Sequence, residues 1–175
     1  MGKKGLIPNY LTILRIFLTI PVIILSLFDS FYIFTGILFF IAIFTDYLDG
    51  KFARKYNQVS NLGKFLDPLA DKILVLSILI VLVEKKEIPF FIPIIILIRE
   101  FAITGLRSIL AQKGIVLSAL KEGKIKTFLQ DMSILFYIFK FPGKELLLFS
   151  AIFFTIYSGI IYFLKYWKIL SESEI

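Results

Sequence analysis

The stretch Asp46-Tyr-Leu-Asp-Gly-Lys-Phe-Ala-Arg54 is followed, after eight residues, by Gly63-Lys-Phe-Leu-Asp-Pro-Leu-Ala-Asp71. Apolar segments flank it, from Phe31 to Thr45 and from Ile73 to Val83. Charged side chains beside such segments are costly unless they pair, hydrate or bind ions. The acidic stretch therefore predicts a functional site where two apolar helices meet.

The first two aspartates of this stretch lie at helical spacing. If the apolar helix over residues 31–55 continues through the motif, Asp46 and Asp49 share one face and Ala53 lies one turn further along it. Each aspartate taken alone also fits a simple charge at a membrane interface, so the prediction depends on the whole set.

The second pair of aspartates predicts the beginning of another helix. Asp67 before Pro68 suits a helix N-cap followed by proline at the first helical position. Asp71 then lies one turn further on, over the same face. A turn that contains Asn61 and Gly63 would join the two helices and bring all four carboxylates into one cleft. Asp67 alone would need no role beyond capping.

Four carboxylates in one cleft repel one another, and divalent cations remove that conflict. Ligand sets made only of oxygen favour Mg²⁺ or Mn²⁺ over zinc. The chain has no Cys and no His. That composition excludes disulfides, thiol nucleophiles, a histidine base and zinc bound by Cys or His. We therefore predict a carboxylate site for Mg²⁺ or Mn²⁺.

Length and composition indicate a membrane protein. The chain has 175 residues, of which 58% are hydrophobic and 19% charged, and its mean hydropathy is +0.88. These values are too apolar for a soluble domain. We predict an all-α integral membrane protein whose single domain covers residues 1–175. The net charge of +7 favours anionic lipids. It does not indicate nucleic-acid binding, because the basic residues lie beside the membrane spans.

The apolar runs predict six transmembrane helices separated by short polar turns. Arg15 lies inside the first of them, where it either snorkels to the interface or faces a polar cleft. The six predicted helices cover approximately residues 9–28, 31–55, 67–83, 89–112, 124–139 and 145–170.

Lys and Arg are distributed unevenly between the two sides of the predicted membrane. With both termini on one side, that side holds thirteen of them, against Lys85, Lys86, Lys140 and Lys144 on the other. The positive-inside rule then places both termini and the acidic motif on the cytoplasmic face. We predict a multi-pass protein of the inner cell membrane, with its active-site cleft at the cytoplasmic interface.

The acidic stretch resembles the signature of the CDP-alcohol phosphotransferases, D-x2-D-G-x2-A-R-x8-G-x3-D-x3-D, at every fixed position and without insertion. The resemblance implies a metal-dependent phosphotransferase in which Asp46, Asp49, Asp67 and Asp71 hold two ions. It identifies Asp71 as the candidate general base, with Asp67 also in the catalytic set. It further implies a homodimer.

The other motif residues predict the nucleotide subsite. Arg54 is suited to the diphosphate, while Gly50 and Ala53 lack the bulk that would keep a nucleotide away from the helix. Close packing against a neighbouring helix is the alternative explanation for both small residues. The predicted CDP-binding residues are Asn9, Thr12, Asp49, Gly50, Ala53, Arg54 and Gly63.

Three further segments resemble the bacterial phosphatidylglycerophosphate synthases within this family: Pro8-Asn9-Tyr-Leu-Thr-x-x-Arg15, Arg99-Glu100-x-x-Ile-x-x-Leu-Arg107 and Gly123-Lys124-x-Lys126-Thr127. The resemblance implies that a phosphatidyl group passes from CDP-diacylglycerol to glycerol 3-phosphate. Since Arg suits bidentate phosphate binding, the acceptor phosphate is predicted to bind at Arg99, Arg107, Lys124 and Lys126. The alternatives are a structural ion-pair network around Arg99 and Glu100, and ordinary flanking charges at the two lysines.

Other functions remain open from the sequence. The basic residues favour a phosphorylated acceptor without separating glycerol 3-phosphate from inositol phosphate, and serine, choline or phosphatidylglycerol are the acceptors of sibling enzymes. An aspartate-rich intramembrane prenyltransferase would have more spans and a different aspartate spacing. A metal-ion transporter would show ion flux without nucleotide dependence, and it leaves Gly50, Ala53 and Arg54 unexplained.

Overall fold

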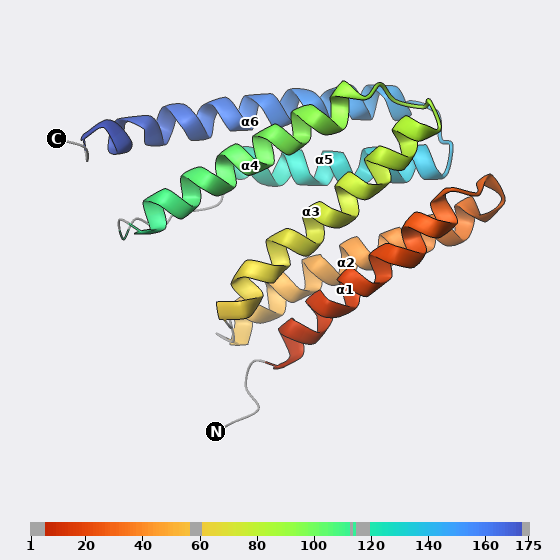
Figure 1. Cartoon of the computed structure of the whole chain (residues 1–175), viewed down its shortest axis with the longest axis horizontal. Coiled ribbons are helices and arrows are strands. Elements are labelled where there is room, and N and C mark those ends of the chain that lie inside the picture. The colour runs from red at the N-terminus through yellow and green to blue at the C-terminus, as the bar shows by residue number, and fades with distance from the viewer. Residues whose placement is uncertain (1–5, 57–60, 113, 115–119, 173–175) are drawn as a thin grey trace. The chain divides into compact units, whose positions relative to one another are not determined.

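The computed structural model describes residues 6–56, 61–112, 114 and 120–172, with side chains described for residues 14–45, 69–112, 114 and 120–167. Over these ranges the chain is helical and contains no strand (Figure 1). Its six α-helices confirm the predicted number. The elements are α1 (Leu6–Ser26), η1 (Asp29–Phe31), α2 (Tyr32–Tyr56), α3 (Asn61–Glu84), α4 (Phe91–Gln112), α5 (Lys121–Ile138) and α6 (Lys144–Glu172).

The predicted beginning of α3 is wrong. The helix begins at Asn61, so Asp67 does not cap it and Pro68 lies in its second turn. Asn is itself a favoured residue at a helix start, and apolar residues follow at helical spacing from Leu62 to Leu66. The proline removes one backbone hydrogen bond, but it does not set the boundary. Both aspartates of the second pair therefore lie on one continuous helix.

Helix α5 also begins earlier than predicted, at Lys121 instead of Lys124. The backbone N–H of Lys124 donates to the carbonyl of Leu120 at 3.4 Å, which closes the first helical turn. Glu122 lies in that turn, where a carboxylate complements the positive end of the helix dipole. Lys124 and Lys126 consequently lie inside the helix, not at its first residue.

The chain divides into two compact units. The first comprises Met1–Ile88 and Ile134–Pro142, and the second comprises Pro89–Ser133 and Gly143–Ile175. Helix α5 contributes to both. The single domain predicted for residues 1–175 stays a prediction.

In the first unit, α1 packs against both α2 and α3, and η1 joins α1 to α2 (Figure 1). The buried side of α1 carries Arg15, Thr19, Val22 and Ser26, at intervals of three or four residues. This spacing is that of one helix face. Because two of these positions are hydroxyl residues and one is an arginine, the interior of this unit is more polar than an ordinary core.

In the second unit, α4 packs along α6. Their contact is a cluster of buried side chains, to which the partly buried Leu120 adds. The cluster consists of Ile103, Leu106 and Leu110 from α4 and Tyr162 and Tyr166 from α6. Two tyrosines in this core bring hydroxyl groups between the helices, where buried polar groups need hydrogen-bond partners.

One helical segment among the described residues is long and apolar enough to cross a bilayer. It is Lys144–Trp167, with 24 residues and a mean hydropathy of 2.1. Shorter apolar segments lie at Leu14–Ser26 and Asp29–Thr45. Large apolar side chains are exposed along α6, including Phe149 at 67% and Leu164 at 69%. Apolar surface of this extent marks contact with lipid or with another protein.

Candidate functional site

The four predicted metal ligands lie on two neighbouring helices of the first unit. Asp46 and Asp49 belong to α2, while Asp67 and Asp71 belong to α3. The side chain of Asp71 is described, and it is partly buried. The other predicted residues of the acidic and nucleotide subsites have side chains outside the described ranges: Asn9, Thr12, Asp46, Asp49, Gly50, Ala53, Arg54, Gly63 and Asp67.

The helical register connects the acidic motif to the buried side of α2. Thr35, Phe39 and Ala42 are buried at intervals of four and three residues. Further steps of four, three and four residues along the same continuous helix lead from Ala42 to positions 46, 49 and 53. These positions therefore share a register with the face of α2 that packs inside the unit.

In α3 the aspartates are likewise in helical register with buried residues. Ala70, Leu74 and Ile78 are buried, and positions 67 and 71 precede Leu74 by seven and three residues on the same helix. The prediction of two helices with one acidic pair each thus agrees with the backbone, although the N-cap that led to it is wrong.

Arg15 of α1 lies in the interior of the first unit, with 1% of its surface exposed. Its side chain therefore does not snorkel to the surface. Of the two predicted positions, at the interface or facing inward, the side chain has the inward-facing one. Helix α1, which carries this guanidinium, packs against α2 and α3, the two helices that carry the aspartates of the motif. Since such a charge is stable only with compensation, Arg15 belongs to the polar interior of this unit.

The donor chemistry of the acidic motif fits a divalent cation. All four candidate ligands are carboxylates on two helices that belong to one unit. Oxygen donors of this kind suit Mg²⁺ or Mn²⁺. Among the residues with described side chains no group of three potential ligands gathers, and of the four candidates only Asp71 lies in those ranges. The ligand set stays a prediction.

Three of the four predicted phosphate-binding residues come together in the second unit. Glu100, which is buried, accepts a hydrogen bond from Nη1 of Arg99 at 3.0 Å and another from Nζ of Lys126. Lys126 is buried as well, whereas Arg107 and Lys124 are exposed. The ion-pair network that the sequence left as an alternative is thus present around Arg99, and it also includes Lys126.

Helix α6 contributes two hydroxyl groups and an aromatic ring to this cluster. Nη2 of Arg99 donates to Oγ of Ser158 at 2.9 Å, and Nη2 of Arg107 donates to the hydroxyl of Tyr162 at 3.0 Å. Both guanidinium groups also lie near the ring of Tyr162, at 5.8 and 5.5 Å from its centre. At these distances cation–π attraction adds to the hydrogen bonds.

Three cations belong to this cluster. Arg99 and Lys126 donate to the carboxylate of Glu100, and Arg107 donates to Tyr162. Nε of Arg99 is buried and has no hydrogen-bond partner among the described residues. Several basic side chains together with an unused guanidinium donor suit an anion that carries several oxygen acceptors, such as a phosphate.

Ser158 and Tyr162 were not predicted from the sequence. A signal for them exists, because polar residues recur at helical spacing within the apolar helix α6: Thr155, Ser158, Tyr162 and Tyr166. Small and hydroxyl-bearing residues in apolar helices often mark helix–helix contacts and interhelical hydrogen bonds. Gly159 lies on the same stretch. A Cβ atom there would approach Cγ of Arg99 to 3.2 Å, so the glycine makes room for the arginine.

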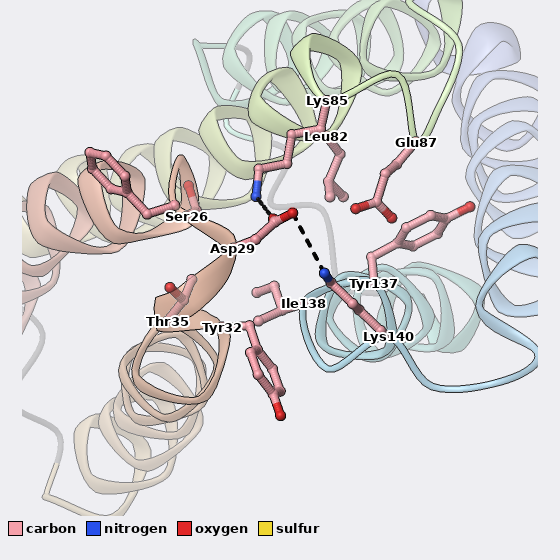
Figure 2. A pocket seen from close by; sticks show the side chains of 11 residues that line it. Ser26, Asp29, Tyr32, Thr35, Leu82, Lys85, Glu87, Tyr137, Ile138 and Lys140 are labelled. Atoms are coloured by element: carbon pink, nitrogen blue, oxygen red, sulfur yellow. Dashed lines mark hydrogen bonds and ion pairs between the residues drawn. The ribbon is translucent and has the colours of Figure 1, made fainter.

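A second polar feature lies in the first unit and was not predicted either. Asp29 of η1 pairs with Lys85 at 2.5 Å and with Lys140 at 3.6 Å, at a pocket that Tyr32 and Tyr137 also line (Figure 2). The hydrogen bond and charge of Lys85, together with the charge of Lys140, lower the pKa of Asp29 below its ordinary value of 3.8. Asp29 therefore links the turns that follow α1, α3 and α5.

Comparison with known proteins relates the chain to one family. The model of the family described as CDP-alcohol phosphatidyltransferase matches residues 5–157. A Bacillus subtilis protein named CDP-diacylglycerol–glycerol-3-phosphate 3-phosphatidyltransferase is 48% identical over 147 residues, which cover 79% of this chain and 76% of that protein. A Rickettsia felis protein of the same name is 39% identical over 173 residues, covering 90% and 93%. A Mycobacterium tuberculosis protein named probable phosphatidylglycerophosphate synthase is 33% identical over 165 residues, covering 88% and 78%.

Proposed function

Because the chain belongs to the CDP-alcohol phosphatidyltransferase family, we propose that it transfers a phosphatidyl group from CDP-diacylglycerol to glycerol 3-phosphate. The products are phosphatidylglycerophosphate and CMP, and the role is phospholipid biosynthesis. The observation that carries this proposal is the 48% identity to a relative whose name states the reaction. The cluster of basic side chains in the second unit, Arg99, Arg107 and Lys126, supports a phosphorylated acceptor.

Asp46, Asp49, Asp67 and Asp71 would hold two divalent cations, either Mg²⁺ or Mn²⁺, beside the second half of α2 and the first half of α3. When bound, these ions supply positive charge that neutralises the diphosphate of CDP-diacylglycerol as CMP leaves. Since α2 and α3 belong to the same unit, the two helices would fix the positions of the four carboxylates relative to one another.

The nucleotide and diphosphate would bind along the same helices. Arg54 would contact the diphosphate, since a guanidinium can donate to two phosphate oxygens at once. Gly50 and Ala53 leave room for the nucleotide beside α2. Asn9 and Thr12 on α1 and Gly63 on α3 complete this proposed subsite.

Asp71 is the proposed general base. In the reaction, an oxygen of a glycerol 3-phosphate hydroxyl forms a bond to the lipid-side phosphorus of CDP-diacylglycerol, and the bond from that phosphorus to CMP breaks. The hydroxyl proton passes to the carboxylate of Asp71. An Asp71→Asn variant that keeps full transferase activity would exclude this assignment.

Four basic residues would receive the phosphate of the acceptor. Arg99 and Lys126 approach it from the ion-pair network around Glu100, while Arg107 and Lys124 are exposed. Arg99 and Lys126 are thus held in place by Glu100, whereas Arg107 and Lys124 can be reached by solutes. Phosphate oxygens suit this arrangement because they accept several charged hydrogen bonds.

The enzyme is proposed to cross the inner cell membrane six times, with both termini and the catalytic cleft on the cytoplasmic side. The uneven distribution of Lys and Arg between the two predicted sides supports this orientation, and the apolar segment Lys144–Trp167 supports membrane insertion. A homodimer in the membrane is the proposed assembly. Accessibility of single engineered cysteines to a membrane-impermeant thiol reagent tests the topology, because the chain has no cysteine of its own.

The reaction is tested by CMP release from CDP-diacylglycerol in mixed micelles with Mg²⁺. Parallel assays contain glycerol 3-phosphate, inositol phosphate, serine or no acceptor. We expect release with glycerol 3-phosphate and background release with the others. Release only with another acceptor would preserve the family chemistry and overturn the proposed substrate. Absence of release with every acceptor would overturn the proposed function.

A further inference from the structure

Tyr162 of α6 contacts two other helices of its unit, α4 and the beginning of α5. Its side chain is buried, with 2% of the residue exposed. The hydroxyl oxygen accepts a hydrogen bond from Nη2 of Arg107 on α4 at 3.0 Å. It accepts another from the backbone N–H of Leu120, at the start of α5, at 2.9 Å. One phenol oxygen thus ties the arginine to the helix that carries Lys124 and Lys126.

The ring of Tyr162 adds a second contact to the same arginine. The guanidinium carbon of Arg107 lies 5.5 Å from the ring centre, and that of Arg99 lies 5.8 Å from it. Tyr166 stacks on the ring, with 6.0 Å between the ring centres and an interplanar angle of 29°. The phenol therefore has neighbours on its face and at its hydroxyl, and they fix its position.

A fixed phenol restricts a side chain that would otherwise be flexible. Arg107 is an exposed residue near the end of α4, and a free arginine samples many rotamers, which it must give up to bind an anion. The hydrogen bond to Tyr162 holds Nη2 in place and leaves the other guanidinium N–H groups for a ligand. Holding the side chain before the ligand arrives reduces the entropy lost on binding.

We propose that Tyr162 is a positioning residue for the phosphorylated acceptor: its hydroxyl fixes the guanidinium of Arg107 in the orientation that receives the acceptor phosphate. Tyr162 acts through Arg107 and does not itself contact substrate. The inference rests on the proposed function, because it assumes an acceptor that carries a phosphate.

The test compares Tyr162→Phe with the wild-type enzyme in the CMP-release assay. The variant removes one oxygen atom and retains the ring. We expect the KM for the phosphorylated acceptor to rise about tenfold, which corresponds to about 1.4 kcal/mol. The kcat and the KM for CDP-diacylglycerol should stay within about twofold of the wild type. A purely structural defect would lower the amount of active enzyme, and hence kcat, without this selective change.

Tyr166→Phe is the matched control. Tyr166 lies one turn further on the same helix, is buried to a similar degree and makes no hydrogen bond through its hydroxyl among the described residues. The control should leave both KM values unchanged. If it raises the acceptor KM as much as Tyr162→Phe does, the effect comes from the tyrosine pair in general, and the inference is wrong.

A double variant tests whether the effect passes through Arg107. In an Arg107→Ala background, Tyr162→Phe should change the acceptor KM less than twofold, because the group it positions is already absent. Independent, multiplying effects would overturn the inference.

The acceptor in these assays is the one that supports release in the wild type. If that acceptor is inositol phosphate, the proposed substrate is wrong, but the same comparison of variants still tests the proposed role of Tyr162. If wild-type release with glycerol 3-phosphate is normal and Tyr162→Phe leaves its KM unchanged, Tyr162 alone is wrong. An acceptor without phosphate overturns both.

Discussion

Replacing Lys126 by methionine should destabilise the protein much more than the same replacement at Lys124. The two lysines lie two residues apart on α5 and carry the same charge. Lys126 is 5% exposed and donates to buried Glu100, whereas Lys124 is exposed. Methionine is apolar and similar in length, so each variant mainly removes one ammonium group. The pair therefore separates the effect of burial from the effect of charge.

The expected magnitude follows from the contacts of Glu100. Removing one partner of a buried ion pair costs about 3–5 kcal/mol, because the remaining charge stays buried without compensation. Nη1 of Arg99 still donates to Glu100 at 3.0 Å, so we expect the lower part of this range, about 3 kcal/mol. For a chain of this size 1 kcal/mol shifts the melting temperature by about 2–4 °C. Lys126→Met should therefore lower it by about 6–12 °C.

The measurement is thermal unfolding of the purified protein in detergent, followed by far-ultraviolet circular dichroism, which reports helix content. Lys124→Met should melt within about 2 °C of the wild type, since exposed charges contribute little. In the CMP-release assay, however, Lys124→Met should raise the KM for glycerol 3-phosphate. Equal melting temperatures for the two variants would refute the reasoning, because Lys126 would then not stabilise a buried carboxylate.

Three further outcomes are expected. Removal of divalent cations with EDTA should abolish CMP release, and added Mg²⁺ or Mn²⁺ should restore it; activity that persists in EDTA would exclude a metal-dependent site. Gly36→Ala should lower stability by about 1–3 kcal/mol, because a Cβ atom there would overlap the ring of Phe139. Gly105→Ala, with nothing within 4 Å of the added atom, should be neutral or slightly stabilising, and equal losses would contradict the packing argument. Asp29→Asn should lower the melting temperature at neutral pH, because the lowered pKa of Asp29 stabilises the fold above its ordinary value of 3.8. The difference from the wild type should disappear as the pH falls below 3.8 through the lowered value, and a constant difference down to that range would show that the two lysine partners contribute nothing.

The helices were predictable because their signal is local. Apolar runs and polar turns predict all six helices, and η1 lies where the predicted ranges 9–28 and 31–55 meet. The beginning of α3 was missed because the sequence Asp67-Pro68 is a strong local start signal, while the helical spacing of the residues before it is a weaker one. The start of α5 also differs from the prediction, because the turn from Lys121 to Gly123 already belongs to the helix expected from residue 124.

The contacts of the basic cluster were predictable only in part. Arg99 and Glu100 are adjacent in the sequence, so their pairing was foreseen as an alternative to phosphate binding. Lys126 joins them from 26 residues away, and Tyr162 meets Arg107 across 55 residues. No local pattern specifies which lysine of α5 is buried or which hydroxyl of α6 receives a guanidinium, because the packing of three helices decides both. The resemblance supplied the residues, and the structure supplies their partners.

An anion site must both be stable when it is empty and bind its ligand, and the partners of the basic residues divide these two requirements between different side chains. Cations gathered for a phosphate repel one another until the ligand arrives, and this repulsion opposes folding. In the second unit Glu100 compensates Arg99 and Lys126, which are the more buried cations, while Arg107 keeps an exposed position beside Tyr162. We therefore expect the inner cations to determine mainly the stability of the fold and the outer ones, Arg107 and Lys124, to determine mainly acceptor affinity. If Lys124→Met and Tyr162→Phe lower stability as much as Lys126→Met does, this division of roles is wrong.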